Sequence, residues 1–437
     1  YIYIYIYFVP QNVSIPDTVI VTTPQYFSRL NDWFSNADHS LQSKTLYEFF
    51  FIKATLSKID MLDSNTREIY RIMHSKIGSG TTAPPLRVRE CIGNTADLFG
   101  QMLGRYFVML KFGGEEQRLN AAKMIDNIRS TWANRLDKIE WLDDVTRKRA
   151  VDKVNSIDHQ EAYSIHTPDD RSPKALKEYY NGIIIDSGNY YENQMSGHSW
   201  FFKKEWSRVG QPVDKTKWYM DPQDVNAYYS PTSNQVVVPA GILQPPFYGD
   251  GLPEYLNYGG IGVVIGHEIT HAFDNSGRLY DGGGHLSQWW TNETSDAFQE
   301  KTKCFVKQYG NFSIEGVNGT TYNVNGKLTL GENLADNGGV HAAWTAMKKT
   351  MESSPEKNLR LPGLEDLTPE QLFFINFGRV WCTNMRPQMA VQRIRSDVHS
   401  PAMVRVNAAV QNNVAFNEAF KCGAKKPMNP EEKCLIW

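Results

Sequence analysis

The spacing of apolar residues along the first 200 positions is mostly that of α-helices. One set of apolar side chains, three or four positions apart, shares a single helical face: Leu98, Met102, Tyr106 and Met109. Stretches with the same period run over residues 115–139 and 143–157, and Thr23-Pro24 is a typical helix start. We therefore expect a helical region from about residue 23 to about residue 200.

The pattern changes in the second half of the chain. Residues 234–239 read Asn-Gln-Val-Val-Val-Pro, a β-branched run ended by proline that predicts a strand. Residues 261–273 are mostly apolar and predict a buried helix, and Thr368 with Gln371 forms a capping box at a later helix start. The expected fold class is mainly α with a small β component (α+β), with two domains over residues 11–190 and 191–437.

The buried segment contains His267-Glu268-Ile269-Thr270-His271, in which the two histidines have the spacing of metal ligands. Positions four apart on a helix lie within about 40° of each other, so both imidazoles can reach one zinc ion at about 2 Å. Glu268 projects beside that metal, where it can take a proton from water. Burying three polar groups without a partner is unfavourable, and a bound metal removes that penalty.

A third zinc ligand must come from outside this helix. One class of zinc peptidase has glycine and histidine where this chain has Asp274 and Gly277, so that class is excluded. Glu293 is a conceivable ligand, although its place inside the sequon Asn292-Glu293-Thr294 suggests an exposed position.

Glu332 is the stronger candidate for the third ligand. If its segment is helical, Glu332 and Asp336 share one face, one turn apart. Asp336 would then accept the second N–H of a ligating histidine and fix its tautomer. Gly338 and Gly339 would let this helix approach the histidine helix closely.

Charge and composition exclude several other functions. The chain has 46 basic and 48 acidic residues, so it offers no electrostatic basis for binding nucleic acid or an anionic membrane. No stretch of 18 apolar residues is present that could span a membrane.

Sequons and cysteines bear on the compartment. Four N-x-S/T sequons favour a secreted or luminal protein: Asn12, Asn292, Asn311 and Asn318. The five cysteines form no CxxC pair, which argues against a cysteine zinc site, and their odd number leaves at least one thiol without an internal partner.

The zinc motif lies within residues 264–274, and five further segments accompany it: residues 331–339, 226–228, 239–247, 397–401 and the terminal Cys-Leu-Ile-Trp of 434–437. Together they resemble the neprilysin and endothelin-converting-enzyme family of zinc metallopeptidases, and the resemblance runs from about Asp17 to Trp437. It implies a thermolysin-like peptidase domain over residues 191–437, preceded by part of a helical covering domain.

The resemblance also implies roles for individual residues. His267, His271 and Glu332 would bind one Zn²⁺, with Glu268 as the catalytic base and Asp336 as the partner of a ligand. His399, oriented by Asp397, would stabilise the oxyanion, and Arg405 would hold a substrate carbonyl. Asn226 and Ala227 would bind the peptide backbone. The apolar pocket for the residue after the scissile bond would be lined by Ile242, Phe247, Val264 and Trp381.

The same resemblance implies a disulfide between Cys304 and Cys434, whereas Cys91, Cys382 and Cys422 match positions whose partners lie upstream. Complete members carry a membrane span before the ectodomain. We therefore expect this chain to be a piece of a longer protein that is located outside the cell or at its surface, either as an ectodomain anchored by an upstream membrane span or as a secreted protein.

The sequence thus predicts a zinc-dependent endopeptidase that hydrolyses short extracellular peptides on the amino side of bulky apolar residues. The alternative is a non-catalytic or inactive truncated paralogue that acts as a binding or scaffold protein.

Overall fold

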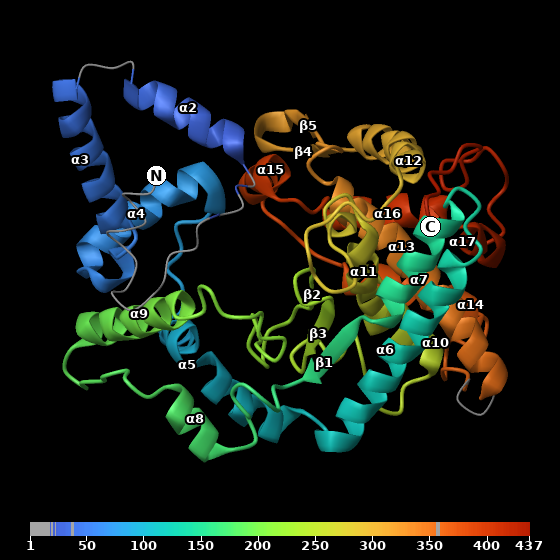
Figure 1. Cartoon of the computed structure of the whole chain (residues 1–437), viewed down its shortest axis with the longest axis horizontal. Helices are drawn as coiled ribbons and strands as arrows, with labels where there is room; N and C mark the ends of the chain where they lie inside the picture. Colours follow the sequence, from blue (N-terminus) through green and yellow to red (C-terminus); the bar gives the residue numbers. More distant parts are fainter. Residues whose placement is uncertain (1–17, 19–20, 22, 36–38, 355–358) are drawn as a thin grey trace. The chain divides into compact units, whose positions relative to one another are not determined.

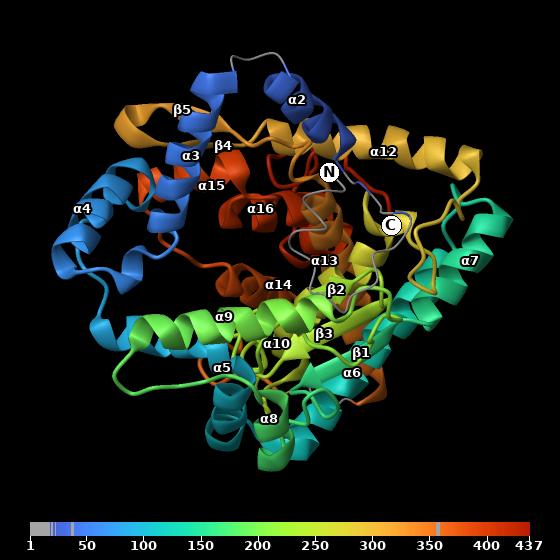
Figure 2. The ribbon, with the colours of Figure 1, turned by 60° about the vertical axis from the view of Figure 1, so that its left-hand side comes forward.

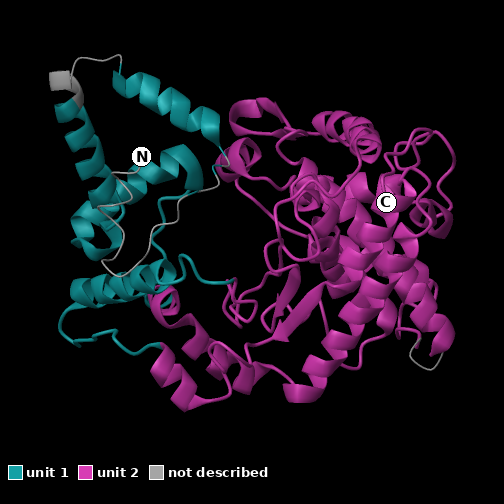
Figure 3. Ribbon diagram, in the orientation of Figure 1, with its two compact units in different colours: residues 1–91, 180–212 teal, residues 92–179, 213–437 magenta. Residues whose placement is uncertain are grey.

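The computed structural model describes residues 18, 21, 23–35, 39–354 and 359–437. The chain divides into two compact units (Figure 3). Unit 1 comprises residues 1–91 and 180–212, and unit 2 comprises residues 92–179 and 213–437. Residues 92–179 thus group with the C-terminal part of the chain. These compact units do not test the domain boundary expected near residue 190, which stays a prediction.

Unit 1 is helical in the part that the structure describes. Its elements are α2 (Pro24–Ser35), α3 (His39–Leu56), η1 (Ile59–Met61), α4 (Ser64–His74), η2 (Ser75–Ser79) and α9 (Tyr190–Trp206). The helix start expected at Thr23-Pro24 is confirmed, because α2 begins at Pro24. The side chain of Asp63 caps α4 by accepting hydrogen bonds from the backbone N–H groups of Asn65 and Thr66.

Unit 2 contains the remaining elements (Figure 1). In its first part these are most of α5 (Arg87–Lys111), α6 (Gly114–Leu136), α7 (Asp144–Asn155), β1 (Asp158–Ala162), α8 (Pro173–Tyr179), β2 (Tyr228–Ser230) and β3 (Gln235–Pro239). Then follow α10 (Glu254–Asn257), η3 (Tyr258–Gly262), α11 (Val263–Thr270), η4 (His271–Phe273), η5 (Gly277–Leu279), α12 (Asn292–Gly310), β4 (Ser313–Glu315), η6 (Val317–Gly319) and β5 (Thr321–Asn323). The last helices are α13 (Leu330–Ser353), α14 (Pro369–Val380), α15 (Pro387–Ser396), α16 (Ala402–Asn412) and α17 (Val414–Ala419).

The long helices agree with the sequence pattern. The two amphipathic stretches are α6 and α7, and α14 begins at the predicted capping box of Thr368 and Gln371. The apolar face expected around Leu98 lies on α5, and part of this face is exposed. Tyr106 and Met109 on that face are 56% and 63% exposed.

A three-stranded sheet, in the order β1-β3-β2, lies beside the long helix α6 (Figure 2). β3 is the predicted strand; it runs parallel to β1 and antiparallel to β2 and is buried along its whole length. β1, with the sequence Asp-His-Gln-Glu-Ala, falls in a stretch expected to be helical. It has no apolar alternation, and its extended form comes from backbone pairing with β3.

Helices α11 and α13 are in backbone contact at a set of glycines. A Cβ built on Gly266 would lie 2.8 Å from the carbonyl oxygen of Gly339, and one on Gly338 would lie 2.6 Å from Thr270 Oγ1. The close approach expected from Gly338 and Gly339 is therefore confirmed. It brings two segments more than 60 residues apart in sequence to one place.

Candidate metal centre

The helix around His267 is part of the core of unit 2. Ile265 and Ile269 are fully buried, and His267 and Glu268 are only 7% and 6% exposed. The 3₁₀ turn η4 continues α11 and carries His271. The buried helix predicted for residues 261–273 is thus present, and its polar residues lie where unpaired polar groups are unfavourable.

Three side chains bring one ligand atom each to a common point. His267 Nε2 lies 3.0 Å from His271 Nε2, and Glu332 Oε2 lies 3.1 Å and 3.4 Å from these two atoms. Ligands bound at 2.0–2.1 Å to a tetrahedral zinc ion are about 3.3 Å apart. Among the described residues, these three form the one group of His, Cys, Asp or Glu side chains close enough to hold a metal ion.

Each histidine of this group is oriented by a carboxylate. His267 Nδ1 lies 2.9 Å from Asp336 Oδ1, and His271 Nδ1 lies 2.6 Å from Asp274 Oδ2. A carboxylate can only accept, so each Nδ1 carries the proton and each Nε2 directs a lone pair at the common point. Burial alone would raise the pKa of Asp336, but Arg405 and His267 hold it below its ordinary value.

The surroundings of the buried Glu332 Oε2 show whether the three candidate ligands are suited to hold a cation. Glu332 Oε2 is buried and accepts no hydrogen bond from His267 or His271, whose Nε2 atoms lie beside it without a proton. Lone pairs of two nitrogens and a carboxylate oxygen repel one another unless a cation lies between them. The donor set of two imidazoles and one carboxylate, at these distances, fits zinc.

The guanidinium of Arg405 is held by other side chains of the protein. Its Nε and Nη2 donate to Asp336 Oδ2 and Oδ1 at 2.8 Å and 2.7 Å, and its guanidinium lies 3.9 Å from the centre of the Trp381 ring. The residue is 7% exposed, and burial alone would lower its pKa, but Asp336 raises it. Arg405 therefore locks the carboxylate that orients His267, and its contact with a substrate carbonyl stays a prediction.

His399 lies at the open side of the same centre. Its Nε2 is 3.2 Å from Glu332 Oε2, and its Nδ1 is 2.8 Å from Asp397 Oδ1, as expected for an oriented imidazole. Glu332 raises the pKa of His399, against the opposing effect of burial. Arg393 also holds Asp397, with its Nε 2.8 Å from Asp397 Oδ2.

One pocket of about 590 Å³ contains the metal group. Glu268 and His399 line this pocket, and so do all seven residues expected to contact substrate: Asn226, Ala227, Ile242, Phe247, Val264, Trp381 and Arg405. These residues come from the β2 region, the turn after β3, α11, the end of α14 and α16. The structure thus brings every predicted catalytic and substrate-binding residue into one cavity.

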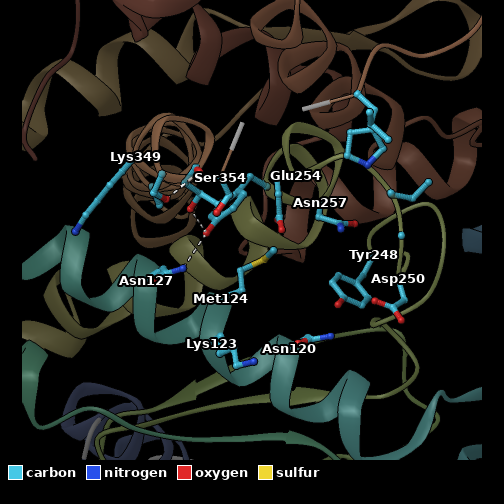
Figure 4. Close-up of a pocket in the computed structure, with 18 of the residues that line it drawn as sticks. Asn120, Lys123, Met124, Asn127, Tyr248, Asp250, Glu254, Asn257, Lys349 and Ser354 are labelled. Carbon is cyan, nitrogen blue, oxygen red and sulfur yellow. Dashed lines mark hydrogen bonds between the residues drawn. The ribbon is translucent and has the colours of Figure 1, made fainter. Parts of the chain in front are cut away.

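A second pocket, of about 450 Å³, lies between α6, the segment 248–258 and the end of α13 (Figure 4). Asn127 donates to the Tyr258 hydroxyl, which in turn pairs with Thr350. None of the predicted site residues lines this pocket, so it is separate from the metal centre.

Other residues singled out in the sequence lie away from the centre. Glu293, the weaker ligand candidate, is exposed in the first turn of α12 and does not belong to the metal group. The sequon residues Asn292, Asn311 and Asn318 are exposed, and Asn12 lies outside the described residues.

The cysteines agree with the pairing that the resemblance implied. Cys304 and Cys434 form a disulfide that ties α12 to the C-terminal segment. Cys91 and Cys382 are exposed and Cys422 is partly exposed, and their upstream partners stay a prediction.

Asp274 was missed as a functional residue in the sequence. Its position three residues after His271, at the end of the ligand helix, was the available signal. An acidic residue at that spacing can turn back to the imidazole Nδ1.

The mainly α fold, the buried histidine helix and the carboxylate from a second helix define a zinc metallopeptidase type of domain. No helix in the described ranges is long and apolar enough to cross a bilayer. The sequence pattern of Peptidase family M13 matches residues 3–164 and 226–436. The chain belongs to this family, and its resemblance to neprilysin and endothelin-converting enzymes is confirmed.

Curated relatives show the extent of the similarity. The chain is 38% identical to mouse (Mus musculus) membrane metallo-endopeptidase-like 1, covering 96% of the chain and 54% of the relative. It is 38% identical to human (Homo sapiens) neprilysin, covering 98% and 56%. Among solved structures, the Mycobacterium tuberculosis zinc metalloprotease Zmp1 in complex with an inhibitor matches with a TM-score of 0.77 and 30% identity, covering 87% of this chain and 56% of that one. The chain therefore spans about half the length of these relatives.

Proposed function

We propose that this chain carries the catalytic centre of a zinc-dependent endopeptidase that hydrolyses short extracellular peptides on the amino side of bulky apolar residues. The observation that carries the proposal is the convergence of the ligand atoms of His267, His271 and Glu332 in a pocket that also contains Glu268. A protein that only binds its partner would not need a general base such as Glu268 beside these metal ligands.

The chain's own residues supply the other parts of the chemistry. Zinc held by His267, His271 and Glu332 would act as a Lewis acid on the scissile carbonyl. Glu268 would take a proton from the attacking water and deliver it to the leaving amine. His399, held by Asp397 with its Nε2 directed at the centre, would donate a hydrogen bond to the oxyanion.

The substrate would bind along the edge of the small sheet. β2 is an edge strand of that sheet, and Asn226 and Ala227 precede it directly. An extended peptide added there would gain main-chain hydrogen bonds and place one side chain in the pocket. The apolar walls at Ile242, Phe247, Val264 and Trp381 favour a bulky apolar side chain after the scissile bond.

Two features support an extracellular location. The Cys304–Cys434 disulfide is typical of an oxidising compartment, and three sequon asparagines are exposed. Anchoring of the longer protein to a membrane upstream is part of the same proposal.

Substitution Glu268→Gln tests the function directly. We expect cleavage of a fluorogenic peptide to fall by about 10²–10⁴-fold, with zinc stoichiometry unchanged, because only the base is removed. The matched control is Glu293→Gln, an exposed carboxylate on α12. If the parent chain binds zinc and cleaves no peptide, the binding or scaffold alternative holds instead.

A further inference from the structure

Lys153 is an ammonium group buried in the core of unit 2. It lies on α7 and is 1% exposed, although lysine is among the side chains least often fully buried. Its Nζ lies 5.6 Å and 5.4 Å from the ring centres of Phe273 and Trp289, which provide cation–π contacts. Such a costly burial requires specific partners.

The partners of Lys153 are three backbone carbonyls of one turn. Its Nζ donates to the carbonyl oxygens of Ala272, Gly277 and Tyr280 at 2.7 Å, 2.9 Å and 2.6 Å. An ammonium has three N–H donors, and all three are used. Ala272 follows the ligand His271 directly, so the positive charge lies at the C-terminal end of the ligand helix, where it is favourable.

The same turn holds the carboxylate that orients His271. Asp274 Oδ1 accepts from the backbone N–H groups of Ser276 and Gly277 at 2.7 Å and 2.6 Å, and Asp274 Oδ2 lies 2.6 Å from His271 Nδ1. A Cβ built on Gly277 would lie 1.7 Å from the carbonyl oxygen of His271, so the turn is packed directly against the ligand.

These contacts form a continuous chain from Lys153 to the metal ligand. The ammonium holds the carbonyl of Gly277, the N–H of Gly277 holds Asp274, and Asp274 holds Nδ1 of His271. Burial lowers the pKa of Lys153 to about 7, while Asp274 and Asp281 act in the opposite direction. Among the described residues of α7, the side chains of Arg147 and Arg149 donate to the carbonyls of Ile139 and Trp289, which lie outside this turn.

We propose that Lys153 is a positioning residue of the metal centre, which fixes the turn 272–280 so that Asp274 stays on Nδ1 of His271. This inference deepens the proposed function and rests on the zinc site that it assumes. A partner of a ligating histidine typically contributes a factor of about 10–100 to metal affinity.

Substitution Lys153→Met tests the proposal, because it keeps an unbranched side chain, one heavy atom shorter, and removes its donors. We expect zinc affinity, measured by competition with a chromophoric chelator, to fall about 10-fold or more. We also expect the visible absorption spectrum of the cobalt(II)-substituted chain to change, since the imidazole of His271 would be oriented differently.

Arg147→Met is the matched control on the same helix. Arg147 also donates to three backbone carbonyls, those of Asp137, Ile139 and Leu142, but these lie away from the metal group. We expect this variant to lose stability while its zinc affinity and cobalt spectrum stay those of the parent.

A double-mutant cycle with Asp274→Asn separates positioning from general destabilisation. If Lys153 acts through Asp274, adding Lys153→Met to Asp274→Asn changes zinc affinity less than twofold, because contacts in one network are not additive. Full additivity, or a Lys153→Met variant with parental zinc affinity and cobalt spectrum, would overturn the proposal.

Two further outcomes are distinguishable. If Lys153→Met does not fold, Lys153→Arg is measured in its place. It keeps the charge but cannot direct three N–H groups from one nitrogen, so we expect a smaller loss of zinc affinity, and parental affinity would overturn the proposal. If the parent itself binds no zinc, the proposed function fails, whereas a failure of Lys153 alone leaves the zinc centre intact.

Discussion

Gly266 on α11 and Gly339 on α13 are in direct backbone contact. A Cβ on Gly266 would lie 2.8 Å from the carbonyl oxygen of Gly339, and a Cβ on Gly339 would lie 2.7 Å from the backbone nitrogen of His267. No side chain fits between them. This pair therefore sets the distance between the helix of His267 and the helix of Glu332.

Substitution Gly266→Ala is expected to weaken zinc binding as well as the fold. The added methyl group must push α13 away, which costs about 1–3 kcal/mol in free energy of unfolding. It also moves Glu332 relative to His267, so zinc affinity should drop. Chemical denaturation and chelator competition measure the two effects.

The control for this change is Gly93→Ala on α5, where an added Cβ meets nothing within 4 Å. There, alanine should be neutral or stabilising by up to about 1 kcal/mol. Equal stability and zinc affinity in Gly266→Ala and the parent would show that the helices separate without effect on the site.

Substitution Val264→Phe should change specificity without affecting the metal. Val264 is half-buried and lines the pocket, so a phenyl ring there occupies the space of a substrate side chain. We expect kcat/KM for peptides with a bulky apolar residue after the scissile bond to fall about 10–100-fold, and less for peptides with alanine there. Steady-state kinetics on a pair of such peptides measure this ratio.

Val145→Phe, on the exposed face of α7, is the matched control and should leave both substrates unaffected. A uniform loss on both substrates in Val264→Phe would mean that Val264 does not form the specificity pocket.

Removal of the disulfide by the double substitution Cys304→Ala and Cys434→Ala should lower the free energy of unfolding by about 2–5 kcal/mol. The bridge closes a sequence separation of 130 residues and holds the C-terminal segment. The Trp437 ring in that segment lies 5.9 Å from the ring of Phe273, two residues after His271. Thermal denaturation with and without a chelator should show that stabilisation by zinc also decreases.

Cys382→Ser, at an exposed cysteine, serves as the control for loss of a thiol. A parental melting temperature in the double variant would show that packing of Trp437 alone holds the segment.

His341 should make the fold sensitive to acid. Burial, together with Arg135, lowers the pKa of His341 to about 4, below its ordinary value near 6.5. Between these two pKa values the unfolded chain binds a proton that the folded chain does not. The free energy of unfolding therefore falls as the pH drops through this window, and the contribution of His341 to it is fully present above the window. From pH 7 to pH 5 the contribution of His341 is up to about 2 kcal/mol.

Urea denaturation at the two pH values checks this sign. His341→Gln should remove that part of the pH dependence, whereas His285→Gln, whose side chain is 79% exposed, should keep it. A His341→Gln variant with the pH dependence of the parent would contradict the prediction.

Local spacing in the sequence predicted most of the long helices, the strand β3 and the pair of histidines proposed as metal ligands. Helical geometry alone places His267 and His271 on one face, and the capping box of Thr368 and the β-branched run of 234–239 predict their elements for similarly local reasons. The polar strand β1 was missed because its extended form depends on pairing with β3, a partner remote in sequence.

Only the tertiary structure decided which distant residues complete the centre. The glycine contact between α11 and α13 brings Glu332 to the histidines, whereas Glu293 is exposed on α12. Packing of α16 against α13 places Arg405 on Asp336. The turn after α11 brings Asp274 to His271 and is itself held by Lys153. The physical reason is that periodicity specifies which side chains share a face, whereas helix packing and turn closure determine which faces meet.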